Sequence, residues 1–225
     1  MNRSTIRSFV RRALMEDAAD NWTDAELNII INAAAQSWQD YILAVDDTAL
    51  LEWHYASLVK DQRYYAKPAG MRQEVELGYL GDGGEYQPMS VTSFGAIRRG
   101  WNKGSSNRNS DVDLNADGTV TYEYAHAGAW FYLDWKPSAA LVDGLECAYV
   151  PDISLGSDTE SPAIALGLHY GIVTEAVIMA KGETEEDDSR WVRERQIMVS
   201  KIPHFYRKTS AGPEVVHPDV RKAAY

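Results

Sequence analysis

The chain has 225 residues, a net charge of −11, 45% hydrophobic residues and a single cysteine, Cys147. Its length allows a substantial core, and the single cysteine excludes an internal disulfide or a zinc site built from several cysteines. The negative charge is the opposite of what a protein needs to bind the phosphates of nucleic acid. Because no apolar run reaches the roughly 18 residues of a membrane span, and residues 1–10 lack the apolar core of a signal peptide, we expect the protein to be made and kept in a cytosol.

Two helices are predicted at the N-terminal end of the chain. The first, over residues 4–17, groups apolar residues on one face, at Ile6, Phe9, Val10, Ala13 and Leu14. The second lies within residues 21–47, where Thr23 and Glu26 have the spacing of a capping box. Apolar residues then recur every three or four positions, at Leu27, Ile30, Ile31, Ala34, Trp38, Tyr41, Ile42 and Val45. The short polar joint between the helices favours an antiparallel pair.

Between residues 51 and 150 the pattern changes to short runs rich in Tyr, Val and Trp, separated by turn clusters of Gly, Asp and Pro. Such runs are typical of β-strands. Strands are predicted near residues 51–59, 62–66, 73–80, 119–124, 129–135 and 144–150. A short helical turn is predicted within residues 91–101, and the very polar residues 100–111 indicate a mobile loop.

A second helix pair is predicted after the β-rich region. Ser161 and Pro162 are typical of a helix start and would open a helix over residues 161–181. In that helix Gly167 and Gly171 would leave a flat strip where another backbone approaches closely. The last helix runs from Thr184 to residue 202. Its first turn would hold four acids, which suit the positive end of the helix dipole: Glu185, Glu186, Asp187 and Asp188.

Residues 203–225 begin with Pro203, which is expected to stop the last helix, and they show no period. They are either a disordered terminus or an arm that orders on a partner, and the pattern leaves both open. The second interpretation rests on aromatic and basic residues, which a purely solvating tail would not need. The residues expected to bind a partner are Phe205, Tyr206, Arg207, Lys208, Arg221, Lys222 and Tyr225.

The predicted fold class is α+β, with three parts. Residues 1–48 and 160–202 would form a helical bundle, because neither helix pair can bury its apolar stripe alone. Residues 49–159 would form an inserted, antiparallel β-rich domain. Residues 203–225 would form an extended C-terminal arm.

Several local motifs occur together in a characteristic order. Residues 22–27 read Trp-Thr-Asp-Ala-Glu-Leu before a helix rich in Asn, Ala, Gln and aromatic residues. Gln62, Tyr64 and Pro68 approximate a Gln-x-Tyr-x-x-Pro strand with one extra residue before the proline. A turn, two strands around Pro137, a small-residue helix and a charged helix follow. In these features the chain resembles the head–tail adaptor, or connector, proteins of tailed phages, including the tail-tube adaptors of short-tailed phages.

The resemblance implies a structural protein of the virion, without catalysis, located at the head–tail interface after assembly in the host cytoplasm. Copies of the chain would form a ring, expected to contain twelve subunits, beneath the portal protein. The ring would extend the DNA channel and attach a tail, nozzle or tail-tube protein. Viral DNA would pass through the lumen without specific binding, and no membrane would be contacted. Residues 203–225 would reach the portal or a neighbouring copy.

A different chemistry is suggested by Asp113, Asn115 and Asp117, which have the spacing of the first, third and fifth positions of an EF-hand calcium loop. The twelfth position is Tyr124 rather than a bidentate Glu, and the flanks resemble strands, so a polar turn is favoured. These three residues are therefore candidates for a metal site only. The alternative function is a calcium- or carbohydrate-binding module carried on a helical bundle.

A peptidoglycan hydrolase is a further alternative, in which carboxylates such as Glu52 or Glu85 could form an acid pair, although no particular pair is marked in the sequence. No nucleotide-binding glycine pattern and no nucleophile elbow occurs in the sequence, so no catalytic residue and no cofactor is assigned. His169 is expected to be packed or at an interface, Cys147 to be a small buried hydrophobe, and Trp38 with Tyr41 to belong to the core.

Overall fold

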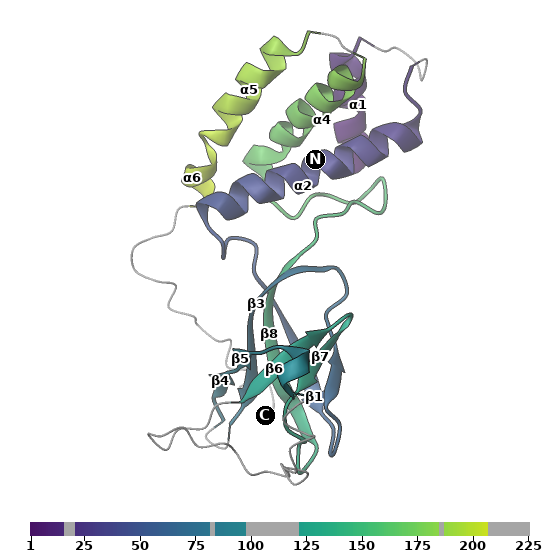
Figure 1. Ribbon diagram of the computed structural model, residues 1–225. Helices are drawn as coiled ribbons and strands as arrows, with labels where there is room; N and C mark the ends of the chain where they lie inside the picture. The colour runs from purple at the N-terminus through teal and green to yellow at the C-terminus, as the bar shows by residue number, and fades with distance from the viewer. Residues whose placement is uncertain (16–20, 82–83, 98–121, 185–186, 207–225) are drawn as a thin grey trace, which may run out of the picture. The chain divides into compact units, whose positions relative to one another are not determined.

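The computed structural model describes residues 1–15, 21–81, 84–97, 122–184 and 187–206, and their fold is α+β (Figure 1). The chain divides into two compact units: a helical unit of Met1–Leu50 with Ile153–Tyr225, and a β unit of Leu51–Asp152 inserted into it. The predicted division, at residues 48 and 160, differs most at its second boundary. Residues 153–160 join the helical unit because Ile153 and Leu155 are buried in its core.

The helical unit is built around α4, which packs against α1, α2 and α5 (Figure 1). Its helices are α1 (Arg3–Ala13), α2 (Asp24–Val45), the 3-10 turn η1 (Leu166–Leu168), α4 (His169–Glu183), α5 (Ser189–Val199) and α6 (Ile202–Phe205). One core joins them, because the buried faces of α1, α2, α4 and α5 belong to a single cluster of apolar side chains. No helix of the described residues is both long enough and apolar enough to cross a membrane.

The start of α2 confirms the predicted capping box. The backbone N–H of Thr23 donates to Glu26 Oε2 at 2.8 Å, and the backbone N–H of Glu26 donates to Thr23 Oγ1 at 3.3 Å. Most of the predicted apolar stripe is buried, and the indole of Trp38 is fully buried. Its ring meets that of Tyr41 edge-on, with centroids 5.7 Å apart, so this region belongs to the core as expected.

Two polar residues of α2 were not predicted to be structural. The Asn32 side chain accepts a hydrogen bond from the backbone N–H of Leu155 at 3.0 Å, and the buried Gln39 accepts one from Ile153 at 3.4 Å. Both backbone groups belong to an irregular segment whose donors have no strand or helix to bind them. These two amides therefore fix residues 153–155 against the helix.

Several predicted helix ends are wrong. The first helix ends at Ala13 rather than residue 17, and Met15 beyond it has a positive φ of 60°. The helix expected to start at Ser161 starts instead at Leu166, where η1 leads directly into α4. Ile164 and Ala165 are bound instead by side chains. His169 Nε2 donates to the Ile164 carbonyl at 3.0 Å, and the Ala165 N–H donates at 2.7 Å to the hydroxyl of Tyr206, 41 residues further along the chain.

The last helix also differs from its prediction. It begins at Ser189 with Asp188 at the N-cap, so Asp187 and Asp188 precede the helix instead of forming its first turn, while Glu185 and Glu186 lie outside the described residues. Asp187 accepts a hydrogen bond from the Ser189 N–H at 3.0 Å, and these contacts lower the pKa of its carboxyl. Pro203 does not end the helical region, because it lies inside α6, where a proline in the first turn costs no backbone hydrogen bond.

Gly167 in η1 and Gly171 in α4 allow a close approach, but of aromatic rings rather than of another backbone. A Cβ atom at Gly167 would lie 2.5 Å from Cζ of Phe205. A Cβ atom at Gly171 would overlap the indole of Trp38. The two glycines therefore make room for side chains from α6 and α2.

The β unit consists of two four-stranded sheets. Sheet A has the order β1-β8-β3-β4, formed by β1 (Glu52–Leu58), β8 (Leu141–Pro151), β3 (Met71–Leu80) and β4 (Tyr86–Pro88). Sheet B has the order β2-β7-β6-β5, formed by β2 (Tyr64–Ala66), β7 (Trp130–Leu133), β6 (Glu123–Ala127) and β5 (Ser90–Val91). All strand pairs are antiparallel, as predicted, except the short parallel pair β5–β6.

Five of the predicted strands correspond to β1, β2, β3, β7 and β8, whereas β4 and β5 were not predicted. The strand predicted at 119–124 overlaps β6 only at residues 123 and 124, and residues 119–121 lie outside the described residues. The helical turn expected within residues 91–101 is present at residues 94–97. The polar loop expected at 100–111 lies outside the described residues. The two sheets share one small core, to which Leu77 and Cys147 contribute from sheet A and Tyr65 and Phe131 from sheet B.

Candidate interaction surfaces

Most of the residues singled out in the sequence lie outside the described part of the chain. These are the metal candidates Asp113, Asn115 and Asp117 and the arm residues Arg207, Lys208, Arg221, Lys222 and Tyr225. Of the seven arm residues, only Phe205 and Tyr206 are described.

Phe205 and Tyr206 contact their own helical unit instead of extending from it. The Tyr206 hydroxyl accepts a hydrogen bond from the backbone N–H of Ala165, and the Phe205 ring lies against Gly167. Phe205 still exposes 48% of its surface. These two residues therefore anchor the beginning of the predicted arm on the helical unit, and Phe205 leaves one side of its ring accessible.

Aromatic side chains of sheet B and of the helical turn at residues 94–97 form an exposed to half-buried group, which we call the aromatic face. It consists of Tyr64, Phe94, Trp130 and Tyr132. Trp130 and Tyr132 alternate along β7 with the buried Phe131 and Leu133, so they point away from the core. Tyr64 is paired directly with Tyr132 across the strands, and Tyr64 and Trp130 are 54% and 45% exposed.

The rings of the aromatic face meet edge-on. The Tyr64 and Trp130 planes form an angle of 88° with centroids 5.7 Å apart, and those of Phe94 and Tyr132 form an angle of 80° at 5.2 Å. Rings at right angles do not make the flat platform that stacks on a sugar ring. Exposed Tyr and Trp are instead enriched in the cores of protein–protein interfaces, so this surface is suited to a protein partner.

On sheet A, the carboxylate of Glu146 lies near the rings of Tyr55 and Tyr86. Glu146 is 6% exposed on β8, and it lies opposite Tyr55 on β1 and opposite Gly78 on β3. The rings of Tyr55 and Tyr86 are 5.9 Å apart. Burial, followed by the charge of Glu146 and a hydrogen bond to it, raises the pKa of Tyr55 to about 12. The Tyr55 hydroxyl therefore stays protonated and donates to the carboxylate, which makes this arrangement structural.

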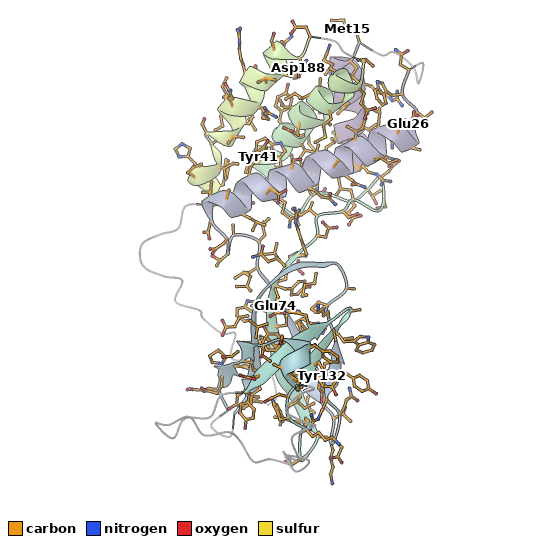
Figure 2. The ribbon with its side chains drawn as sticks, in the orientation of Figure 1. Met15, Glu26, Tyr41, Glu74, Tyr132 and Asp188 are labelled. Carbon is orange, nitrogen blue, oxygen red and sulfur yellow. The ribbon has the colours of Figure 1, made fainter. Side chains whose placement is uncertain are left out.

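A second polar group joins the two sheets, where the hydroxyl of Tyr124 on β6 donates to Oε1 of Glu74 on β3. Figure 2 labels the position of Glu74 in the β unit. His126 Nε2 lies 3.7 Å from Glu74 Oε2. Burial raises the pKa of Tyr124, and it raises that of the neighbouring Cys147 thiol to about 12. Because a cysteine acts as a nucleophile only as the thiolate, Cys147 is a buried apolar side chain, as expected from the sequence.

The structure does not bring Glu52 and Glu85 together as a catalytic acid pair. Glu52 begins β1 and accepts a hydrogen bond from the Tyr149 hydroxyl at 3.0 Å. Glu85 precedes β4 at the opposite edge of sheet A, with β8 and β3 between them. Three strand spacings amount to ~14 Å, whereas glycosidase carboxylates lie roughly 5 to 9.5 Å apart.

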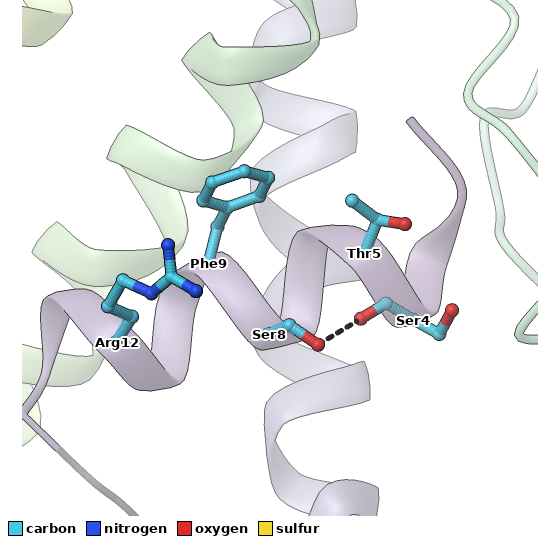
Figure 3. A pocket seen from close by; sticks show the side chains of 5 residues that line it. All are labelled: Ser4, Thr5, Ser8, Phe9 and Arg12. Atoms are coloured by element: carbon cyan, nitrogen blue, oxygen red, sulfur yellow. Dashed lines mark hydrogen bonds between the residues drawn. The ribbon is translucent and has the colours of Figure 1, made fainter.

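The outward side of α1 has an open hollow of about 240 Å³ (Figure 3). Its lining residues are Ser4, Thr5, Ser8, Phe9 and Arg12. The guanidinium of Arg12 lies 5.8 Å from the centre of the Phe9 ring, a cation–π contact. Phe9 was predicted to be buried with Ile6 and Val10, but it is 38% exposed, so the buried face of α1 is narrower than the spacing indicated.

His169 is packed inside the helical unit, as expected, with 4% of its surface exposed. Its Nε2 lies 3.0 Å from the Ile164 carbonyl oxygen, so that nitrogen carries the proton and donates. Its Nδ1 is then the acceptor, and the Met1 ammonium group lies 2.6 Å from it. Burial lowers the pKa of the imidazole, which keeps the ring neutral in this role.

No protein-family profile matches the sequence, and no curated protein matches it either.

Proposed function

We propose that this protein is a head–tail adaptor of a tailed phage, a structural subunit that joins the portal to the tail. The observation that carries the proposal is the layout of the chain, in which helices from both ends form one unit and a two-sheet unit is inserted between them. That layout agrees with the order of motifs on which the resemblance rests, with residues 22–27 leading into α2. The adaptor would have a helical bundle of N- and C-terminal helix pairs, and residues 207–225 would belong to its extended arm.

The exposed side chains support a protein that assembles with other proteins. Aromatic and apolar residues lie on the surface of both units, at Phe9 on α1 and in the aromatic face of sheet B. The separation of Glu52 from Glu85 and the perpendicular rings of the aromatic face give no support to the glycan-directed alternatives. The negative charge of the chain suits a channel wall, because phosphates that bind a wall would slow the passage of DNA.

In this proposal a ring of twelve copies docks beneath the portal protein in the virion and extends the DNA channel. A tail, nozzle or tail-tube protein binds the opposite side of the ring. DNA passes through the lumen without specific contacts.

The proposal is tested by mixing the full chain with a portal ring and imaging the mixture by negative-stain electron microscopy. We expect a ring of added density at the narrow end of the portal. An unrelated acidic protein of similar size serves as the control, and it should leave the portal unchanged. Portal particles that look the same with and without this chain, at concentrations well above those of the portal, would contradict the adaptor function.

A further inference from the structure

The N-terminal helix carries an unusual charge for this chain. Four of the 22 Lys and Arg residues lie between residues 3 and 12, a stretch without any Asp or Glu, while the chain as a whole has 33 acids. Three of these arginines form ion pairs with carboxylates of the helical unit. Arg3 and Arg7 lie 3.0 Å from the carboxylate of Asp158, and Arg11 lies 2.7 Å from that of Asp24.

Arg12 is the exception. It is exposed, and within the described part of the chain no carboxylate pairs with it. Its guanidinium lies over the ring of Phe9 and borders the hollow on α1 (Figure 3). A positive charge, an exposed aromatic ring and a recess are thus combined on one helix face.

The other side chains that line the hollow are small, and two of their hydroxyl groups donate hydrogen bonds to acceptors at the start of the same helix. Thr5 Oγ1 donates to Asn2 Oδ1 at 2.6 Å, and Ser8 Oγ donates to the Ser4 carbonyl at 2.9 Å. Ser4 and Ser8 lie one helical turn apart, so their short side chains let another protein surface come close to the helix. The recess beside Phe9 then has room for one apolar side chain of a partner.

We propose that this outward face of α1 binds an acidic surface of a second copy of the chain, and that this contact joins neighbouring subunits. The inference rests on the proposed adaptor function and names the surface that would build its ring. Charge complementarity selects the occupant, because copies of the chain are strongly acidic outside α1 and none of the described carboxylates pairs with Arg12.

The same charge determines the symmetry of the contact. If two copies met through α1 on both sides, each Arg12 would face a surface that contains Arg12, and like charges would repel. The α1 face therefore binds a different surface on its neighbour, which is a heterologous contact. Heterologous contacts repeat from one subunit to the next and close into a ring when the rotation between neighbours closes, whereas a single self-complementary contact stops at a dimer.

The test compares the assembly of the full chain with that of Phe9→Ala and Arg12→Glu, using analytical ultracentrifugation over a range of protein concentrations. Two variants on α5 are matched controls. Ile197→Ala removes an apolar side chain that is 52% exposed, and Arg190→Glu reverses an arginine that lies 5.2 Å from the ring centre of Trp191. All four changes are at exposed positions, so the folded state of each variant is verified by circular dichroism before assembly is compared.

We expect the unaltered chain to assemble beyond a dimer, and each α1 variant to raise the dissociation constant at least about tenfold, as the loss of a central contact does. The α5 controls should assemble normally, and added salt should weaken assembly of the unaltered chain because it screens the Arg12 contact. A chain that remains monomeric, or α1 variants that assemble like the controls, would overturn the inference.

These outcomes are separate from those of the portal experiment. If Phe9→Ala and Arg12→Glu still decorate the portal as the unaltered chain does, the adaptor function stands and the α1 contact is wrong. If the chain forms rings that depend on α1 but ignore the portal, the contact stands and the adaptor function is wrong.

Discussion

The helical unit and the β unit fill their cores with different kinds of side chain. The buried apolar side chains of the helical unit are aliphatic, apart from Met198, Trp38 and Trp191. The core of the β unit is smaller and contains three tyrosines, Tyr65, Tyr124 and Tyr149, whose hydroxyls all bind polar groups at the edge of the core. The stability of the helical unit should therefore depend mainly on how completely its side chains fill the core. Side-chain hydrogen bonds should contribute more to the stability of the β unit.

The largest effect is expected for Trp38→Ala in the helical unit. The indole is fully buried and fills the space above Gly171, so its removal leaves a large cavity. Loss of a buried aromatic side chain typically costs about 3–5 kcal/mol. Urea unfolding, with amide exchange of α2 and α4 as a local readout, measures the loss. Trp53→Ala, at a 41% exposed position of β1, is the control. A loss no larger than that of the control would show that volume at Trp38 does not limit this unit.

Gly171→Ala tests the same packing in the opposite direction. The added methyl group would collide with the Trp38 ring, and overpacking of this kind costs ~1–3 kcal/mol. Gly182→Ala near the end of the same helix is a matched control, because nothing lies within 4 Å of its added Cβ. Since alanine favours helix more than glycine does, the control should gain up to about 1 kcal/mol. Thermal unfolding measures both, and equal shifts of the same sign would refute the close contact.

Tyr124→Phe addresses the β unit. The substitution keeps the ring and removes the hydroxyl that donates to the partly buried Glu74, so the carboxylate loses a donor. A buried acceptor left without its partner costs ~1–3 kcal/mol. Tyr64→Phe, on the exposed aromatic face, is the control with the same chemical change and should be nearly neutral. Urea unfolding followed by amide exchange in β6 decides the outcome. If both variants are equally stable, the hydrogen bond adds nothing and the contrast between the two cores is lost.

The parts of the structure that follow from local signals could be predicted from the sequence. The capping box of Thr23 and Glu26 and the spacing behind it define α2, because both act within one or two helical turns. The start at Ser161 was wrong for the opposite reason, since the carbonyl of Ile164 is bound by His169 and the N–H of Ala165 by Tyr206. A local helix signal could not show that Tyr206, 41 residues away, would hold the backbone at Ala165 in another conformation.

The difference between local and tertiary signals also explains why the exposed aromatic residues of the candidate surfaces were not predicted. Both faces of β2 and β7 carry aromatic residues, so no alternation of polar and apolar residues marked Tyr64 and Trp130 as exposed. Strands β4 and β5 have only three and two residues and depend on pairing with distant strands. Phe9 has the spacing of a buried residue, and only the packing of α1 against the rest of the unit shows that it is exposed.

The smallest expected effect is a pH dependence from His169, the one buried histidine of the helical unit among the described residues. Burial lowers the pKa of its imidazole below the ordinary 6.5. The unfolded chain therefore takes up this proton near pH 6.5, while the folded chain stays neutral until a lower pH, so stability falls as the pH decreases below that value. The carboxyls of Glu26, Asp158 and Asp187, whose pKa values are also lowered, lose their contributions only in a more acidic range.

His169→Gln should flatten the pH dependence of unfolding between about pH 7.5 and pH 5, the range in which an ordinary histidine titrates. Its stability at neutral pH should also be lower, because glutamine cannot reproduce both contacts of the ring, so the slope rather than the absolute value is the measure. His204→Gln, at an exposed position of α6, is the control and should keep the slope of the unaltered chain. If His169→Gln keeps that slope as well, the proton uptake belongs to a group other than His169. The stability of the helical unit would then depend on the packing of its core side chains even more than the composition of that core indicates.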